Sequence, residues 1–206
     1  MKRKVLLVAL TGAAAVATGV TTWAIESHSA ATSESSESKA PAETRDADWY
    51  LQRGILQEKY QDPPAAAKSY SRVLELEPRN KFAWYNLGHL AHQAGRTADA
   101  RAAYEEALKT DPAFPPALFN EAVLLESSDP EKAVTLLERA VVADPKAATA
   151  HLHLGRIWAR QDRDRKATDE FRRTVAIDPS LLSQVPEEFR DSADPSSTSS
   201  EAGSDS

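Results

Sequence analysis

The chain has 206 residues, of which 41% are hydrophobic and 27% are charged, and its formal net charge is −6. It contains no cysteine, which excludes disulfide bonds, thiolate metal sites and acylation at cysteine. The slight acidity, and a central region without a basic stripe, exclude nucleic acid from the expected partners.

The first 26 residues have the pattern of a signal peptide or a transmembrane anchor. Lys2, Arg3 and Lys4 precede an uncharged run at residues 5–25, and Glu26 ends it. The run is just long enough to span a bilayer, so an uncleaved membrane anchor and a cleaved signal both stay open. Basic residues before such a run keep the N-terminus in the cytoplasm. We therefore expect a membrane-anchored protein with its folded part in the periplasm or at the cell exterior, or a secreted or periplasmic soluble protein after cleavage.

Residues 27–46 are rich in Ala, Ser, Thr and Glu and are expected to form a disordered linker.

An internal repeat follows the linker. Four prolines recur at spacings of 34, 33 and 34 residues, and each one follows an acidic residue: Pro78, Pro112, Pro145 and Pro179. They divide the chain into units 47–80, 81–114, 115–147 and 148–181, which is the signature of a stacked repeat architecture.

Each unit predicts a hairpin of two helices. The eighth residue of every unit is small. The residue at a fixed position near the start of the second helix is also small, and the residue four places after it is large. These sets are Gly54, Gly88, Ala122 and Gly155; Ala66, Ala100, Ala133 and Ala167; and Tyr70, Tyr104, Leu137 and Phe171. Small residues let two helices approach closely, and the large ones fill the space between units. One hairpin cannot bury its apolar face alone, so neighbouring units must stack.

The second unit carries Trp84, Leu87, Gly88, Tyr104, Ala107 and Pro112 in this register, and it resembles the tetratricopeptide repeat family. The resemblance implies an all-α fold: a right-handed α-solenoid of four helical hairpins, preceded by an N-terminal hydrophobic helix and flanked by disordered segments. Three residues depart from the family pattern and bring local packing into question. Arg53 and Glu121 replace a leucine, and Thr174 replaces an alanine.

The repeat pattern stops after Pro179. Residues 182–190 retain Leu182, Val185 and Phe189, and are expected to fold over the last helix as a partial cap that completes a domain at 47–190. The alternative is an open apolar end that docks a partner or a second copy. Residues 191–206 are expected to form a disordered acidic tail.

No motif indicates catalysis. The chain lacks a zinc-protease motif, a phosphate-binding loop and a dinucleotide fingerprint, and its five histidines do not form a metal-ligand pattern. We therefore expect no enzyme activity, no catalytic residue, no metal and no cofactor.

The family resemblance implies that the first helix of each unit lines a concave groove. The residues of the groove that are expected to bind a partner are Leu51, Gln52, Ile55, Phe82, Tyr85, Asn86, His89, Phe119, Asn120, Val123, Leu152, His153 and Arg156. The resemblance also turns toward the groove Asp48, Glu58, His92, Pro116, Glu126, Thr149 and Ala159. The Asn86 and Asn120 amides can both donate to and accept from an extended peptide backbone, and Tyr85 and Phe119 supply apolar anchors beside them. His89 and His153 would add pH-dependent affinity for anions.

These observations predict a non-enzymatic protein–protein interaction scaffold or adaptor, tethered to the membrane by its N-terminal segment or exported, that binds a peptide or helix in the groove. Two alternatives remain: a structural protein that self-associates through the C-terminal apolar end, and a soluble periplasmic chaperone-like protein. The expected partners are thus a protein or peptide, the membrane, and a possible second copy, but no nucleic acid.

Overall fold

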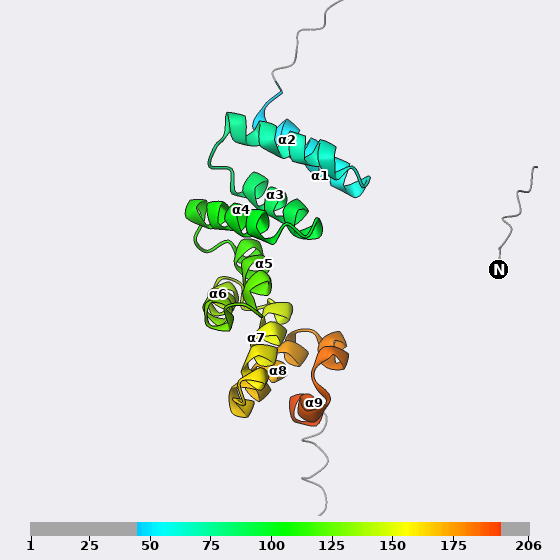
Figure 1. The fold of residues 1–206 in the computed structure, drawn as a ribbon. Helices are drawn as coiled ribbons and strands as arrows, with labels where there is room; N and C mark the ends of the chain where they lie inside the picture. Colours follow the sequence, from blue (N-terminus) through cyan, green and yellow to red (C-terminus); the bar gives the residue numbers. More distant parts are fainter. Residues whose placement is uncertain (1–44, 195–206) are drawn as a thin grey trace, which may run out of the picture. The chain divides into compact units, whose positions relative to one another are not determined.

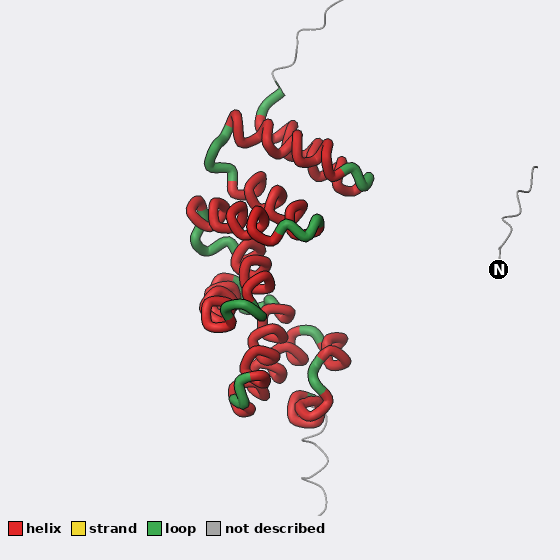
Figure 2. The backbone as a smooth tube through the Cα atoms, in the orientation of Figure 1, coloured by secondary structure: helices red, strands yellow, loops and turns green. Residues whose placement is uncertain are grey.

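The computed structural model describes residues 45–194, which belong to the compact unit Ala42–Ser206. The expected signal or anchor, the linker up to residue 44 and the tail from residue 195 lie outside the described residues. Between residues 45 and 194 the chain is helical with short connections and no strand (Figure 2). No helix in that range has the length and apolarity needed to cross a bilayer.

Eight α-helices of residues 45–181 form four consecutive pairs (Figure 1). The pairs are α1 (Ala47–Lys59) with α2 (Pro63–Leu76), α3 (Lys81–Gln93) with α4 (Thr97–Thr110), α5 (Pro115–Leu125) with α6 (Pro130–Ala143), and α7 (Ala148–Arg160) with α8 (Asp164–Ile177). Helices pack closely within each pair, and the second helix of each pair contacts the first helix of the next. The expected all-α fold of repeated helical hairpins is therefore confirmed.

Local chemistry explains where the helices begin and turn. The Asp62 and Asp129 carboxylates accept hydrogen bonds from the backbone N–H groups of Ala65 (3.1 Å) and Lys132 (3.0 Å), which caps α2 and α6. Proline at the first position of both helices costs nothing, since its missing N–H would have no partner there. Gly95, between α3 and α4, has φ +71°, a conformation that favours glycine.

The core lies between the two helices of each pair and between neighbouring pairs. Ala66, Ala100, Ala133 and Ala167 are fully buried, as the sequence predicts. Two of the departures from the family pattern have local partners. Arg53 is exposed and its guanidinium lies 5.2 Å from the centre of the Trp49 ring. Glu121 is only 2% exposed, and the Lys132 ammonium forms an ion pair with its Oε1 at 2.8 Å.

The C-terminal segment folds back on the last pair. The 3-10 helix η1 (Pro179–Gln184) and helix α9 (Glu187–Ala193) both pack against α8. Val185, Phe189 and Ala193 are buried there, and the centroids of the Phe189 and Phe171 rings lie 5.2 Å apart.

Two expectations about the C-terminal segment need correction. Residues 191–193 are helical rather than disordered, because Ala193 joins this core and the Arg172 side chain donates to the Ser192 carbonyl (2.8 Å). The apolar side chains that an open C-terminal end would offer are covered by the chain itself.

Candidate functional site: the first-helix face

The residues expected to line a groove lie on α1, α3, α5 and α7, and we call their accessible members the first-helix face. Leu51 and Leu152 do not belong to it, because both are buried in the hydrophobic core. Ile55 (45% exposed) and Phe82 (47% exposed) are large apolar residues that stand in solvent. Gln52 is also exposed, and the other expected residues are partly buried: Tyr85, Asn86, His89, Phe119, Asn120, Val123, His153 and Arg156.

Tyr85 lies at the centre of contacts between α3 and α5. The Asn120 Nδ2 donates hydrogen bonds to the Tyr85 Oη (3.2 Å) and to the Pro116 carbonyl (2.9 Å). The Tyr85 ring stacks nearly parallel to His89, with centroids 6.4 Å apart, and meets Phe114 edge-on at 5.6 Å. Burial raises the pKa of the Tyr85 phenol, although the hydrogen bond from Asn120 acts in the opposite direction. The Asn120 amide is thus engaged within the protein, which leaves its carbonyl oxygen as the group for a ligand.

Two histidines of the face are paired with carboxylates of the preceding unit. His89 Nδ1 lies 3.4 Å from Glu58 Oε1, and His153 Nδ1 hydrogen-bonds to Glu126 Oε1. Burial favours a higher pKa for Glu126, but the hydrogen bond from His153 and the nearby Arg160, 3.4 Å away, outweigh it and lower the pKa. An incoming anion would have to compete with these carboxylates, so the geometry does not favour the expected anion affinity.

Glu58 and Glu126 were expected to face the groove, but not to bind the partner. Both occupy the twelfth position of their unit, and each meets a histidine on the first helix of the next unit. The recurring glutamate and histidine were visible in the sequence, but the fact that they meet depends on how the units pack.

The face is hollowed beside Phe119. A cavity of about 400 Å³ lies between the start of α5, the end of α6 and the start of α7. Its lining is mostly apolar: Pro115, Pro116, Phe119, Ala140, Asp144, Ala147, Thr149 and Ala150. The Phe119 ring meets the His153 ring edge-on, with centroids 5.2 Å apart. The hollow therefore lies beside an aromatic contact between α5 and α7. Apolar pockets with a few polar groups at the rim are typical of ligand-binding sites.

The polar groups of the first-helix face differ in whether they are free to hydrogen-bond to a ligand. Within residues 45–194 the Asn86 amide has no hydrogen-bond partner, and it is partly exposed. The Arg156 guanidinium, in contrast, donates to the Gln184 carbonyl at 2.8 Å, which ties α7 to η1. Asn86 is therefore the amide best placed to meet a peptide backbone.

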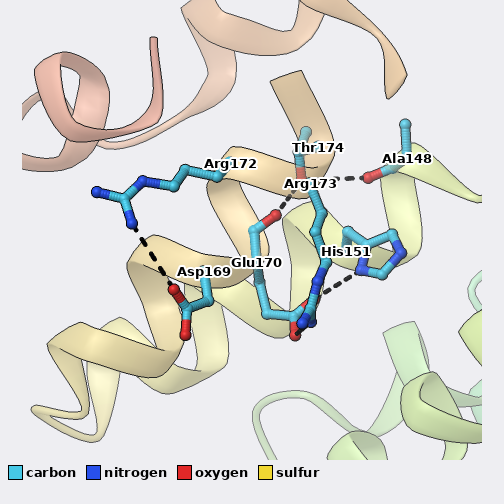
Figure 3. Close-up of polar contacts among 7 residues, drawn as sticks. All are labelled: Ala148, His151, Asp169, Glu170, Arg172, Arg173 and Thr174. Carbon is cyan, nitrogen blue, oxygen red and sulfur yellow. Dashed lines mark hydrogen bonds and ion pairs between the residues drawn. The ribbon is translucent and has the colours of Figure 1, made fainter. Parts of the chain in front are cut away.

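A second polar network, in the fourth unit, has a structural role (Figure 3). The buried His151 Nδ1 lies 2.6 Å from Glu170 Oε2, and Arg173 pairs with the other oxygen of that carboxylate. The Thr174 hydroxyl donates to the Glu170 carbonyl (3.0 Å) and lies 3.4 Å from the Ala148 carbonyl. These contacts give the unusual threonine its partners and join α7 to α8. No group of three metal-ligating side chains occurs in the described part of the chain.

A family model described as tetratricopeptide repeat matches residues 51–115 and 123–181. The chain belongs to the tetratricopeptide repeat family. The family match includes parts of all four hairpins, and the tetratricopeptide fold implies a protein–protein interaction scaffold.

Among curated proteins, the human protein O-mannosyl-transferase TMTC3 is 27% identical over 134 residues, which are 62% of this chain but only 14% of the human protein. A probable peptide N-acetylglucosaminyltransferase, SPINDLY of Solanum lycopersicum, is 29% identical over 89 residues, 43% of this chain and 10% of that protein. This tetratricopeptide chain thus spans a small part of the length of either relative.

Solved structures with the same fold include two of MamA. One superposes with a TM-score of 0.61 at 22% identity, over 72% of this chain and 86% of that one. The other, from Desulfovibrio magneticus RS-1, has a TM-score of 0.57 at 24% identity, over 67% of this chain and 78% of that one. At such identities the likeness supports the tetratricopeptide fold.

Proposed function

We propose that this protein is a non-enzymatic adaptor that binds an extended peptide or a helix of a partner protein along the first-helix face. The observation that carries the proposal is the apolar hollow of about 400 Å³ beside Phe119. It lies on the same face as the exposed Phe82 and the unpartnered Asn86 amide, so one ligand can place apolar side chains on the rings and its backbone on the amide.

The partner is expected to be apolar rather than anionic. Glu58 and Glu126 each lie beside a histidine of the next unit, so carboxylates already occupy the places that an anionic ligand would need. The exposed Ile55 and Phe82 add apolar surface on neighbouring units. The right-handed path of the solenoid, expected from the family, would curve this face into a groove.

We further propose that residues 1–26 tether or export the protein, so that the face works in the periplasm or at the cell exterior. The sequence pattern of Lys2, Arg3 and Lys4 before the uncharged run supports this localisation. A cleaved signal would instead give a soluble periplasmic adaptor with chaperone-like use of the same face. N-terminal sequencing of the mature protein separates these two forms.

A crosslinking experiment in living cells tests the adaptor function. A photoreactive amino acid replaces Asn86 on the first-helix face, Thr149 at the rim of the hollow, or Val142, which is 81% exposed on α6, as the matched control. We expect one shared adduct at positions 86 and 149 and none at 142. Phe82→Ala should reduce that adduct, since Phe82 is half exposed and its removal does not open the core. Equal labelling at all three positions would refute a binding face.

A further inference from the structure

A hollow at the N-terminal end of the array has the chemistry of a docking site. It measures about 660 Å³ and is lined by Tyr50, Arg53 and Gln57 of α1 and by Lys68, Arg72 and Glu75 of α2. We call this surface the N-terminal seat.

The repeat itself shows what kind of object fits the N-terminal seat. In the fourth unit, His151 and Leu154 stand where Tyr50 and Arg53 stand in the first, and both are buried because α6 packs on α7. The same positions are buried in the third unit, beneath α4. No described helix precedes α1. Within residues 45–194, the α1 side of the N-terminal seat therefore lacks the preceding helix that packs on the first helix of every later unit.

The side chains of the N-terminal seat select an acidic occupant. Arg53 replaces the leucine that an apolar helix would require, and its guanidinium lies over the Trp49 ring. Lys68 is exposed, and Arg72 lies 5.9 Å from the Tyr50 ring centre while it pairs with Glu75. Three cations thus face one carboxylate, which favours a helix that carries acidic side chains.

The opposite end of the array carries such a helix (Figure 1). Helix α9 packs against α8 and leaves Glu187 and Glu188 exposed. Residues 181–206 include six acidic residues and a single basic one, Arg190, whose guanidinium is engaged by the Val185 and Ser183 carbonyls. Helix α1 packs mainly against α2, and α9 packs against α8 and η1, so α9 and α1 of one chain do not meet.

We propose that α9 of one copy docks in the N-terminal seat of a second copy, which joins chains head to tail. The contact uses two different surfaces, so it leaves a free seat and a free α9 at the ends and can repeat. It is small and built on exposed charges, and it is therefore weak and sensitive to salt. This association is independent of the first-helix face and goes beyond the adaptor function.

Disulfide trapping tests the proposal on the full-length chain, because the protein has no cysteine of its own. Ser71→Cys, which lines the N-terminal seat, and Ser192→Cys, which is exposed on α9, are introduced together, and the purified protein is oxidised at low and at high salt. We expect a ladder of dimers, trimers and longer species that weakens several-fold at high salt. Each single cysteine should stop at a dimer, since a chain with one thiol can form only one link.

A control replaces the seat cysteine with Val142→Cys, which is also exposed but lies on α6. Trapping in the control pair equal to that of the test pair would overturn the proposal. Self-association of charge-reversal variants, measured by sedimentation, provides a second test. Arg53→Glu with Arg72→Glu, or Glu187→Lys with Glu188→Lys, should each abolish association, and the combination of all four should restore it. A failure of the combination to restore association in a folded protein would also contradict the docking.

Discussion

A methyl group added to Gly155 would lie 2.6 Å from Cδ1 of Phe171, well inside the contact distance of two carbon atoms. The same relationship joins Gly88 and Tyr104, where the distance is 2.7 Å. In the third unit the two places hold Ala122 and Leu137, so a smaller partner on the second helix makes room for a methyl on the first. A hairpin therefore combines glycine on its first helix with an aromatic ring on its second, or alanine with leucine.

Gly155→Ala should therefore lower the free energy of unfolding by about 1–3 kcal/mol, because the Phe171 ring must move in a fully packed core. Chemical denaturation followed by circular dichroism measures the change. Phe171→Leu introduces the leucine that the third unit has at this position. It should therefore lower the free energy of unfolding by less in the Gly155→Ala variant than in the wild-type protein. A rise in stability, of the kind that alanine gives in an unhindered helix, would contradict the steric account.

Two buried tyrosines at equivalent positions should respond differently to loss of the hydroxyl. The Tyr70 Oη donates to the Glu58 carboxylate, whereas the Tyr104 Oη is buried with no hydrogen-bond partner among the described residues. Tyr70→Phe should cost about 1–3 kcal/mol of stability, since a hydrogen bond to a charged group is lost. Tyr104→Phe should be neutral or stabilising. The two melting temperatures, compared side by side, check this, and equal losses would disprove it.

The buried carboxylate of Glu121 depends on Lys132. Its ion pair with Lys132 raises the pKa of the lysine, and a second carboxylate, Glu105, lies 3.5 Å from the same ammonium. Lys132→Ala should destabilise the protein by about 1–3 kcal/mol; we discount the cost of a fully buried pair because the lysine is partly exposed. Glu121→Leu, the usual family residue, should be neutral or stabilising. The double variant should then resemble Glu121→Leu alone, and a further loss in it would show that Lys132 has another role.

Glu126 should make stability depend on acid pH. Its pKa in the folded protein lies below the ordinary value of 4.5, so the folded state holds its proton less tightly than the unfolded chain. The resulting stabilisation is complete above pH 4.5 and is lost as the pH falls through the lowered pKa. Carbon-detected NMR titration of the Glu126 carboxyl measures that value directly. His153→Gln removes the charged partner and should raise the pKa, and no change would remove His153 as its cause.

The C-terminal cap should protect the helix beneath it. Phe189 packs on Phe171, so Phe189→Ala should release α9 and speed amide hydrogen exchange in α8. Glu187→Ala, on the exposed side of the same helix, is the matched control and should leave the exchange unchanged. Equal exchange in both variants would mean that α9 contributes no protection.

The helical hairpins were predictable because each is specified locally. Asp62 followed by Pro63, and Asp129 followed by Pro130, mark helix starts that the structure confirms, and the spacing of the prolines gives the length of every unit. The small and large residues of the repeat also identify the helix crossings before any contact is known. The resemblance of the second unit to the tetratricopeptide pattern made the family evident.

The candidate site was less predictable because it depends on contacts between units. Leu51 and Leu152 share the register of Tyr85 and Phe119, which are partly exposed, yet the neighbouring helices bury the two leucines. Asn120 was expected to serve a ligand, but the Tyr85 hydroxyl of the preceding unit accepts its amide. The helical turn at residues 191–193 was missed because a run of Ser, Asp and Ala carries no apolar period, and its order comes from contact with α8.

The cap that α9 forms on α8 has a consequence for engineering. Helix α9 seals the C-terminal end, whereas the first hairpin keeps the surface on which another hairpin would rest, altered chiefly by Arg53. Restoring leucine at that place and grafting a further module ahead of α1 would lengthen the protein without disturbing its existing joints. Within residues 45–194, the surface that could receive a further hairpin thus lies at the amino-terminal end alone.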